Sequence, residues 1–228
     1  MTKLTQSYYC GASQSQIIYE TIGNYFDGTC AANPEVEAMV VRHQNVRWSY
    51  QQLQEQVNSL ATGLLALGVQ VGDRVGIWGP NSAEWVMVQL ATAKIGAIMV
   101  CINPAYRTYE LEYALNKVEC DTIITAEQFK SSDYLGMLQT LAPELADCEP
   151  CALQSKTLPH LKRVIRMGKE KSQGMLNFDD VCAMGAAEHH ARLTELAAEL
   201  RPDDAINIQF TSGTTGNPKG ATLSHCNI

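Results

Sequence analysis

The feature that most constrains the fold is an alternation of short apolar runs with longer amphipathic segments between residues 74 and 125. Runs at 74–78, 97–102 and 122–125 have the length and composition of buried strands, and helical patterns fill both gaps between them. Strands that are joined by helices through tight loops form right-handed crossovers and a parallel sheet. We therefore predict an α/β fold that is doubly wound, with a mostly parallel sheet and helices on both faces.

The segments on either side of this unit extend the pattern. Strands at 38–41 and 46–48 are predicted to form a hairpin, after which Ser49 and Gln52 have the spacing of a capping box. The helix that starts there should end at Gly68, in the left-handed conformation that glycine tolerates. Further helices are expected at 81–93, with Asn81 as the N-cap, and at 108–118, 134–141 and 186–200, with strands at 163–167 and from 205.

A loop of small hydroxyl residues and glycines follows the last of these strands, at residues 211–220. Gly213 and Gly216 allow backbone N–H groups to approach an anion closely, and Lys219 adds a mobile positive charge. Side-chain donors come from Thr211, Ser212, Thr214 and Thr215. The ordered alternation of hydroxyls and glycines favours a phosphate-binding loop over an ordinary solvent-exposed turn.

The loop differs from the Walker pattern, in which glycine directly precedes the lysine and serine or threonine follows it. Here Pro218 precedes Lys219 and Gly220 follows it. Proline fixes its own φ and disfavours helical backbone in the residue before it. We therefore expect Lys219 to be delivered from a turn and not from the start of a helix.

One stretch resembles the signature of the adenylate-forming enzymes, which include acyl-CoA synthetases, luciferases and peptide-synthetase adenylation domains. It reads Phe210-Thr-Ser-Gly-Thr-Thr-Gly-Asn-Pro-Lys-Gly220. Upstream segments at 78–85, 89–93, 100–106 and 110–115 look most like medium-chain acyl-CoA synthetases of the family-member-2 type. The resemblance covers residues 34–228, so we expect residues 1–33 to be an N-terminal extension and 34–228 to be the N-terminal part of the AMP-binding domain.

The resemblance implies ATP-dependent conversion of a fatty acid to its CoA thioester. In such enzymes the carboxylate attacks the α-phosphorus of ATP, pyrophosphate leaves, and the thiol of CoA captures the acyl-adenylate. The implied substrates and cofactors are a fatty acid, CoA, ATP and Mg²⁺. Lys219 is the candidate catalytic residue, and the candidate nucleotide-binding residues are Thr211, Ser212, Gly213, Thr214, Thr215, Gly216 and Lys219.

The motifs that follow the phosphate loop in this family, and that bind adenine, ribose, Mg²⁺ and the acyl group, are not found in these 228 residues. We therefore expect the chain to be an N-terminal fragment of a fatty-acid–CoA ligase, inactive by itself. Two alternatives stay open. One is a phosphate-binding module that does not catalyse, and the other is an adenylation domain that passes its acyl group to a carrier protein.

Composition limits the possible binding partners and the possible cellular location of the protein. The formal net charge of −7 argues against nucleic acid as a partner. Residues 1–23 hold one Lys, no Arg and no continuous apolar run, which predicts a cytoplasmic location. The longest apolar stretch, 86–102, contains Gln89, Lys94 and Gly96, so we interpret it as a helix followed by a strand and predict no transmembrane segment.

The remaining candidate residues favour structural interpretations. Eight cysteines show no disulfide framework, and the pair Cys148 and Cys151 is interpreted as incidental in preference to a redox or zinc site. His189 and His190 are adjacent on a predicted helix and cannot share one ligand face, so we predict an exposed position and no metal site. His225 has two interpretations that the sequence leaves open: it lines the acyl or phosphate site, or it makes a structural hydrogen bond.

Overall fold

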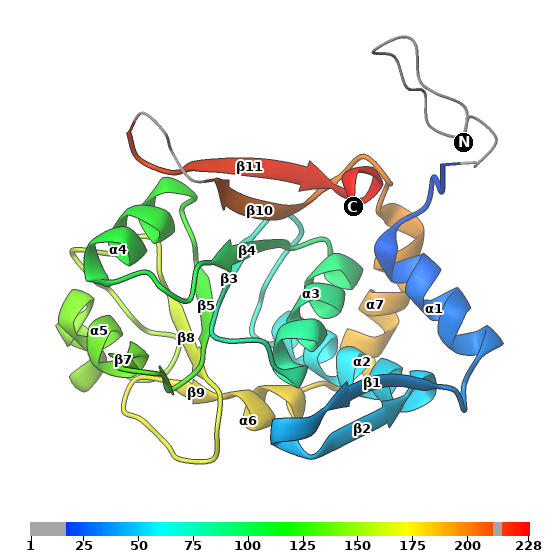
Figure 1. Ribbon diagram of the computed structural model, residues 1–228, viewed down its shortest axis with the longest axis horizontal. Coiled ribbons are helices and arrows are strands. Elements are labelled where there is room, and N and C mark those ends of the chain that lie inside the picture. The colour runs from blue at the N-terminus through cyan, green and yellow to red at the C-terminus, as the bar shows by residue number, and fades with distance from the viewer. Residues whose placement is uncertain (1–16, 212–215) are drawn as a thin grey trace, which may run out of the picture.

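The computed structural model describes residues 17–211 and 216–228. Within these residues, seven strands form one sheet in the order β11-β10-β4-β3-β5-β8-β9 (Figure 1). All neighbours are parallel except β11, which runs antiparallel to β10 at the edge. The strands are β3 (Arg74–Trp78), β4 (Ile98–Ile102), β5 (Thr122–Thr125), β8 (Arg163–Arg166), β9 (Leu176–Asn177), β10 (Ala205–Thr211) and β11 (Lys219–Ser224).

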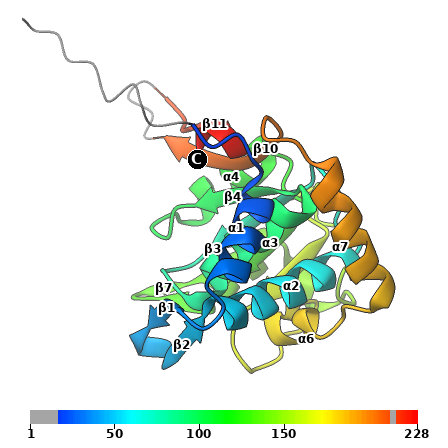
Figure 2. The ribbon, with the colours of Figure 1, turned by 90° about the vertical axis from the view of Figure 1, so that its right-hand side faces the viewer.

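Helices cover both faces of this sheet, as the alternation of strands and helices predicts. Figure 1 shows α4 (Thr108–Lys117) and α5 (Tyr134–Leu141) on one side of it. The other side, which faces the viewer in Figure 2, carries α1 (Ile22–Ala32), α2 (Tyr50–Ala66), α3 (Ala83–Ile95), α6 (Phe178–Cys182) and α7 (Ala187–Glu199). Neighbouring residues of β3 point to opposite faces, so Ile77 lies in the core under α2 and α3 while Trp78 lies in the core under α4 and α5. The prediction of a doubly wound α/β fold is confirmed.

Local signals placed several elements correctly. The predicted hairpin is formed by β1 (Glu37–Val41) and β2 (Val46–Ser49). The capping box is present, because Ser49 Oγ accepts from the Gln52 N–H at 3.3 Å and Gln52 Oε1 accepts from the Ser49 N–H at 2.9 Å. Gly68 follows α2 with φ of +79°. The helix at 134–141 and the strand at 122–125 have the predicted bounds.

The predicted N-cap of α3 is wrong by one residue. Ser82, not Asn81, caps the helix, and its hydroxyl accepts from the Trp85 N–H at 3.2 Å. Glu84 does not close a capping box. Its carboxylate instead accepts from Gln44 Nε2 at 2.7 Å, which ties α3 to the turn between β1 and β2.

Helix α1 has no counterpart among the predicted elements, because Gly23 and Gly28 give it poor intrinsic helix propensity. Tertiary packing compensates: Phe26 and Cys30 are buried against α2 and α3. Lys94 of α3, only 7% exposed, places its Nζ 2.6 and 2.7 Å from the Asp27 carboxylate oxygens. The boundary between an extension at 1–33 and a domain at 34–228 stays a prediction, although α1 packs on the core of the sheet.

The helices of the described residues also bear on the question of a membrane span. Across residues 17–211 and 216–228, no helix combines the length and the apolar composition that crossing a bilayer requires. The apolar stretch at 86–102 forms most of α3 and all of β4, so its residues pack within the α/β core.

Candidate phosphate-binding site

The candidate loop is closed at its base by the pairing of β10 with β11. The register runs from Ala205 opposite Ser224 to Thr211 opposite Lys219. Thr211 Oγ1 also donates to the carbonyl oxygen of Lys219 at 3.4 Å. The structure therefore brings these two predicted site residues together, whereas Ser212, Gly213, Thr214 and Thr215 lie outside the described residues.

A bend directly precedes Pro218 and Lys219, in agreement with the expectation that a turn delivers the lysine. Lys219 is the first residue of β11, and the bend is confined to Gly216 and Asn217 among the described residues of the loop. Gly216 has φ of +139°, a backbone conformation that residues with a Cβ rarely adopt. Among the described residues other than its chain neighbour, no heavy atom lies within 4 Å of where a Cβ would stand. The backbone conformation is therefore a reason for glycine at Gly216.

The two strands present Thr211 and Lys219 on one face of the hairpin. Residues directly opposite each other in an antiparallel pair point their side chains to the same side. Ile208 and Phe210 contribute to the core under α4 and α5. Because side chains alternate along a strand, Thr211 points away from that core, and Lys219 points with it. Both residues are exposed, so the ammonium and the hydroxyl are open to a ligand.

The opposite face of the hairpin is fixed to α4. The hydroxyl of Tyr113 donates to the carbonyl oxygen of Pro218 at 3.1 Å. A Cβ at Gly220 would lie 3.0 Å from Ile208 Cγ2 of β10 and 3.8 Å from Val118 Cγ1, so glycine allows β11 to lie close to the Ile208 side chain. Sequence analysis did not single out Tyr113. Tyr113 lies in the 110–115 segment, which the sequence analysis used only for the family resemblance, and 105 residues separate it from Pro218.

A second loop lies at the same edge of the sheet. It follows β4, the parallel neighbour of β10, and it is tied down by two aromatic side chains. Trp78 Nε1 donates to the Asn103 carbonyl at 3.2 Å, and the Tyr134 hydroxyl donates to the Pro104 carbonyl at 2.7 Å. The two rings stack with centroids 3.9 Å apart. Ligands of open α/β sheets bind at the carboxyl ends of the strands, where both loops lie.

His225 makes the structural hydrogen bond that was one of its two interpretations. Its side chain is 3% exposed, and Nδ1 accepts from the Ile22 N–H at 3.1 Å. Burial lowers the pKa of His225, and the nearby Asp204 carboxylate opposes that shift. The residue follows β11 at the end far from Lys219, about 17 Å along the strand. It therefore joins α1 to the end of β11 and does not line the loop.

The other candidates do not form a site among the described residues. His189 Nδ1 accepts from the Ala186 N–H at 3.1 Å at the start of α7, and His190 is exposed. Cys148 and Cys151 are both free thiols. Across residues 17–211 and 216–228, no group of three or more His, Cys, Asp or Glu side chains is arranged to hold a metal ion.

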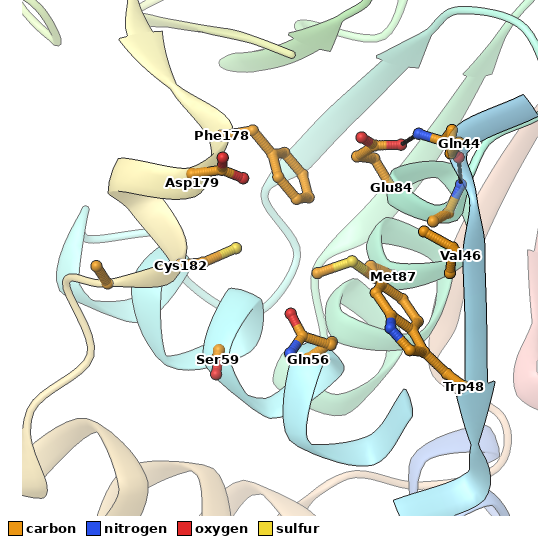
Figure 3. A pocket seen from close by; sticks show the side chains of 12 residues that line it. Gln44, Val46, Trp48, Gln56, Ser59, Glu84, Met87, Phe178, Asp179 and Cys182 are labelled. Carbon is orange, nitrogen blue, oxygen red and sulfur yellow. Dashed lines mark hydrogen bonds between the residues drawn. The ribbon is translucent and has the colours of Figure 1, made fainter. Parts of the chain in front are cut away.

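A cavity of about 440 Å³ lies away from the β10–β11 hairpin, between β2, α2, α3 and α6 (Figure 3). Glu84 and Asp179 face it from opposite walls, with Trp48, Met87 and Phe178 around them. Burial raises the pKa of the Cys182 thiol in this cavity to about 12, and the charges of Asp179 and Glu84 add to the effect. Since its described lining has two carboxylates and no lysine or arginine, this cavity does not suit a phosphate.

The parallel sheet with a glycine-rich hairpin at its carboxyl edge is an architecture that binds ligands in α/β proteins. The family model for the AMP-binding enzyme matches residues 26–228. The medium-chain acyl-CoA ligase ACSF2, mitochondrial, of Mus musculus is 48% identical over 97% of this chain and 36% of its own length. Its Homo sapiens counterpart is 45% identical with the same coverage.

A solved structure agrees in fold. The crystal structure of the anthranilate CoA ligase AuaEII in complex with anthranoyl-AMP superposes with a TM-score of 0.75, at 24% identity. The match covers 95% of this chain and 37% of that one. The chain belongs to the AMP-binding enzyme family, and it spans little more than a third of the length of the curated acyl-CoA ligases that it matches.

The predicted cytoplasmic location is wrong. Both acyl-CoA ligases carry the word mitochondrial in their names, which overturns that prediction. The prediction used only the composition of residues 1–23, and the lack of a leader pattern in one stretch does not specify a compartment.

Proposed function

We propose that this chain is the N-terminal part of a fatty-acid–CoA ligase, which uses ATP to form an acyl-adenylate and then an acyl-CoA. The observation that carries the proposal is the 48% identity to a medium-chain acyl-CoA ligase across 97% of the chain. The chain covers 36% of that relative, so the activity is proposed for the complete protein. Residues 1–228 by themselves are expected to be inactive.

The hairpin loop is proposed to bind the phosphates of ATP. The ligands would be the backbone and hydroxyl groups of Thr211, Ser212, Gly213, Thr214, Thr215 and Gly216. The Lys219 ammonium would stabilise the charge that develops on pyrophosphate as it leaves. The donors fit this ligand, since the eight ion pairs found among the described residues leave Lys219 without a carboxylate partner.

The remaining participants are proposed from the family. A fatty acid and CoA would be the substrates. Mg²⁺ would neutralise phosphate charge when it is bound with ATP. The described residues hold no cluster of carboxylates and imidazoles that fits such an ion. In the family the motifs that bind Mg²⁺ follow the phosphate loop, so we propose that its ligands lie in the part of the complete ligase outside this chain, and we derive no step from the metal here.

Pyrophosphate exchange driven by octanoate tests the proposal. The complete gene product and residues 1–228 should be assayed side by side, with acyl-CoA formation as a second measurement. We expect exchange and thioester formation by the complete protein and only background exchange by residues 1–228. A complete protein that supports neither reaction would refute the ligase, and transfer to a carrier protein in place of CoA would indicate the adenylation-domain alternative.

A mitochondrial location is proposed on the names of the two relatives. Fractionation of cells that express the complete protein with a C-terminal tag tests it. The tag should sediment with mitochondria and resist protease until the membranes are dissolved. A tag that stays in the supernatant would contradict the proposal.

A further inference from the structure

We propose that Tyr113 is a positioning residue for Lys219: its hydroxyl fixes the Pro218 carbonyl and so sets where the lysine is presented to phosphate. The inference rests on the proposed phosphate-binding role of the hairpin. It adds a residue of α4 that neither the phosphate loop nor the family signature contains.

The hydrogen bond acts just beyond the end of the β10–β11 ladder. Among the described residues, Thr211 and Lys219 form the last pair of that ladder, and Pro218 directly precedes it. The Tyr113 hydroxyl lies 3.1 Å from the carbonyl oxygen of Pro218, the residue at that point. Pro218 has no N–H, so its carbonyl is the one backbone hydrogen-bonding group through which it can be fixed.

The residue after α4 lies near the residue that follows the lysine. A Cβ added at Gly220 would stand 3.8 Å from Val118 Cγ1. The hydrogen bond from Tyr113 to Pro218 therefore fixes the backbone next to Lys219 from the α4 side. Because residues alternate along a strand, the Lys219 side chain points to the other, exposed face. The arrangement fixes the lysine's backbone and leaves its ammonium free to reach a ligand.

Fixing the backbone beside Lys219 affects where the ammonium can reach, because the lysine side chain is long. Its four-carbon stem has many rotamers, so the place from which it starts decides which positions the ammonium reaches. A neutral hydrogen bond contributes about two- to tenfold to an equilibrium or rate constant. Loss of the Tyr113 hydroxyl should therefore weaken the lysine's effect without abolishing it.

The chain offers a matched control on the same helix. Tyr109 lies one turn before Tyr113 in α4, and its side chain is 70% exposed. Tyr109→Phe and Tyr113→Phe both remove one phenolic hydroxyl and keep the ring. Only the second substitution removes a hydrogen bond to the hairpin.

Hydrogen exchange on the complete ligase measures the positioning directly. In Tyr113→Phe, the amides of Asn217, Lys219 and Gly220 should exchange about two- to tenfold faster, while the melting temperature and the exchange of β3 and β4 stay as in the wild type. Tyr109→Phe should match the wild type everywhere. Equal exchange at these amides in both variants would overturn the proposal, and so would faster exchange throughout the sheet.

Kinetics separates a positioning role from general support of the fold. Tyr113→Phe should lower kcat for pyrophosphate exchange about two- to tenfold and leave the KM for the fatty acid unchanged. In a Lys219→Ala background the same substitution should have no further effect, because the residue through which it acts is gone. Additive losses would overturn the proposal.

The two proposals fail in different ways. If the wild-type ligase shows pyrophosphate exchange and Tyr113→Phe leaves that activity intact, the positioning role is refuted and the proposed function still holds. No exchange in the wild-type ligase with any fatty acid would refute the proposed function, and the Tyr113 hydrogen bond would then be a structural contact only.

Discussion

The centre of the sheet and its β10–β11 edge are built differently. At the centre, β3 has a strand on each side and helices on both faces, and its last four residues are buried. At the edge, β11 has one neighbour within the described residues, and its first four residues are exposed. The residues that stabilise the fold are therefore concentrated in the centre. The described residues that are proposed to bind the ligand, Thr211 and Lys219, lie at the edge and are exposed.

The difference separates two kinds of substitution. Changes at the centre should alter the free energy of unfolding, because they remove contacts from both cores. Changes on the exposed face of the edge should alter activity and leave stability nearly constant. The experiments below test this separation, beginning with the largest expected effect.

Trp78→Ala should lower the free energy of unfolding of this chain by about 3–5 kcal/mol. Trp78 is fully buried, stacks on Tyr134 and donates to the Asn103 carbonyl, and alanine replaces none of these contacts. Urea unfolding of the variant and the wild type measures the loss. The exposed Tyr109→Ala is the control and should change stability by less than about 0.5 kcal/mol. A loss below about 1 kcal/mol for Trp78→Ala would mean that the centre is not the source of stability.

Lys219→Ala should slow adenylation by the complete ligase about tenfold to a hundredfold, because one charge-assisted contact to the leaving phosphates is lost. Pyrophosphate exchange measures this step. Transfer of a supplied acyl-adenylate to CoA should stay nearly intact, and so should the unfolding free energy. If both half-reactions fall together, Lys219 supports the fold or the acyl site and the separation breaks at this residue.

Gly220→Ala tests how closely β11 approaches the Ile208 side chain of β10 at the edge of the sheet. The added Cβ would stand 3.0 Å from Ile208 Cγ2, so the Ile208 side chain must shift. We expect a loss of about 1 kcal/mol in urea unfolding. Thr222→Ala, an exposed change in the same strand, should be neutral. Equal stabilities of the two variants would show that Ile208 accommodates the added methyl group at no cost.

His225 gives the smallest effect, and it depends on pH. Its pKa is lowered in the folded chain, so between its unfolded pKa near 6.5 and its lower folded value the unfolded chain binds a proton that the folded chain does not. Its contribution to stability is therefore constant above about pH 6.5 and decreases as the pH falls through this window. His225→Asn, which keeps an acceptor for the Ile22 N–H, should lose less stability than the wild type between pH 7.5 and 5.5. Parallel losses in urea unfolding at both pH values would contradict this.

The sequence predicted the parts of the fold that local patterns specify. Ser49 and Gln52 predicted the start of α2, because a capping box acts within one helical turn. The apolar run at 122–125 predicted β5, because a strand that is buried on both faces has a continuous run of apolar residues. Helix α1 was missed because its glycines oppose helix, and the contact that compensates comes from Lys94, 67 residues away. Strand β11 was missed because small polar residues resemble a loop.

The candidate site also has features that the sequence predicted and features that it did not. Its composition identified the loop and Lys219, since glycines, hydroxyls and a lysine are the groups that phosphate requires. The placement of Lys219 in a strand followed from pairing with β10, and the support by Tyr113 depends on a contact across 105 residues. Neither leaves a periodic pattern in the sequence, because both arise only when distant segments meet.

The hydrogen bond between Ile22 and His225 joins two ends of the chain that can meet only late in folding. It closes a span of 203 residues, and β10 finds its place beside β4 only after more than a hundred further residues have followed β4. Contacts so far apart in sequence form slowly, because the entropy of closing the loop is lost before the contact is gained. During synthesis this contact must wait for nearly all of residues 1–228 to emerge from the ribosome, whereas α2 and α3, on which α1 packs, emerge much earlier. The strand that carries the proposed phosphate loop is thus among the last to join the sheet.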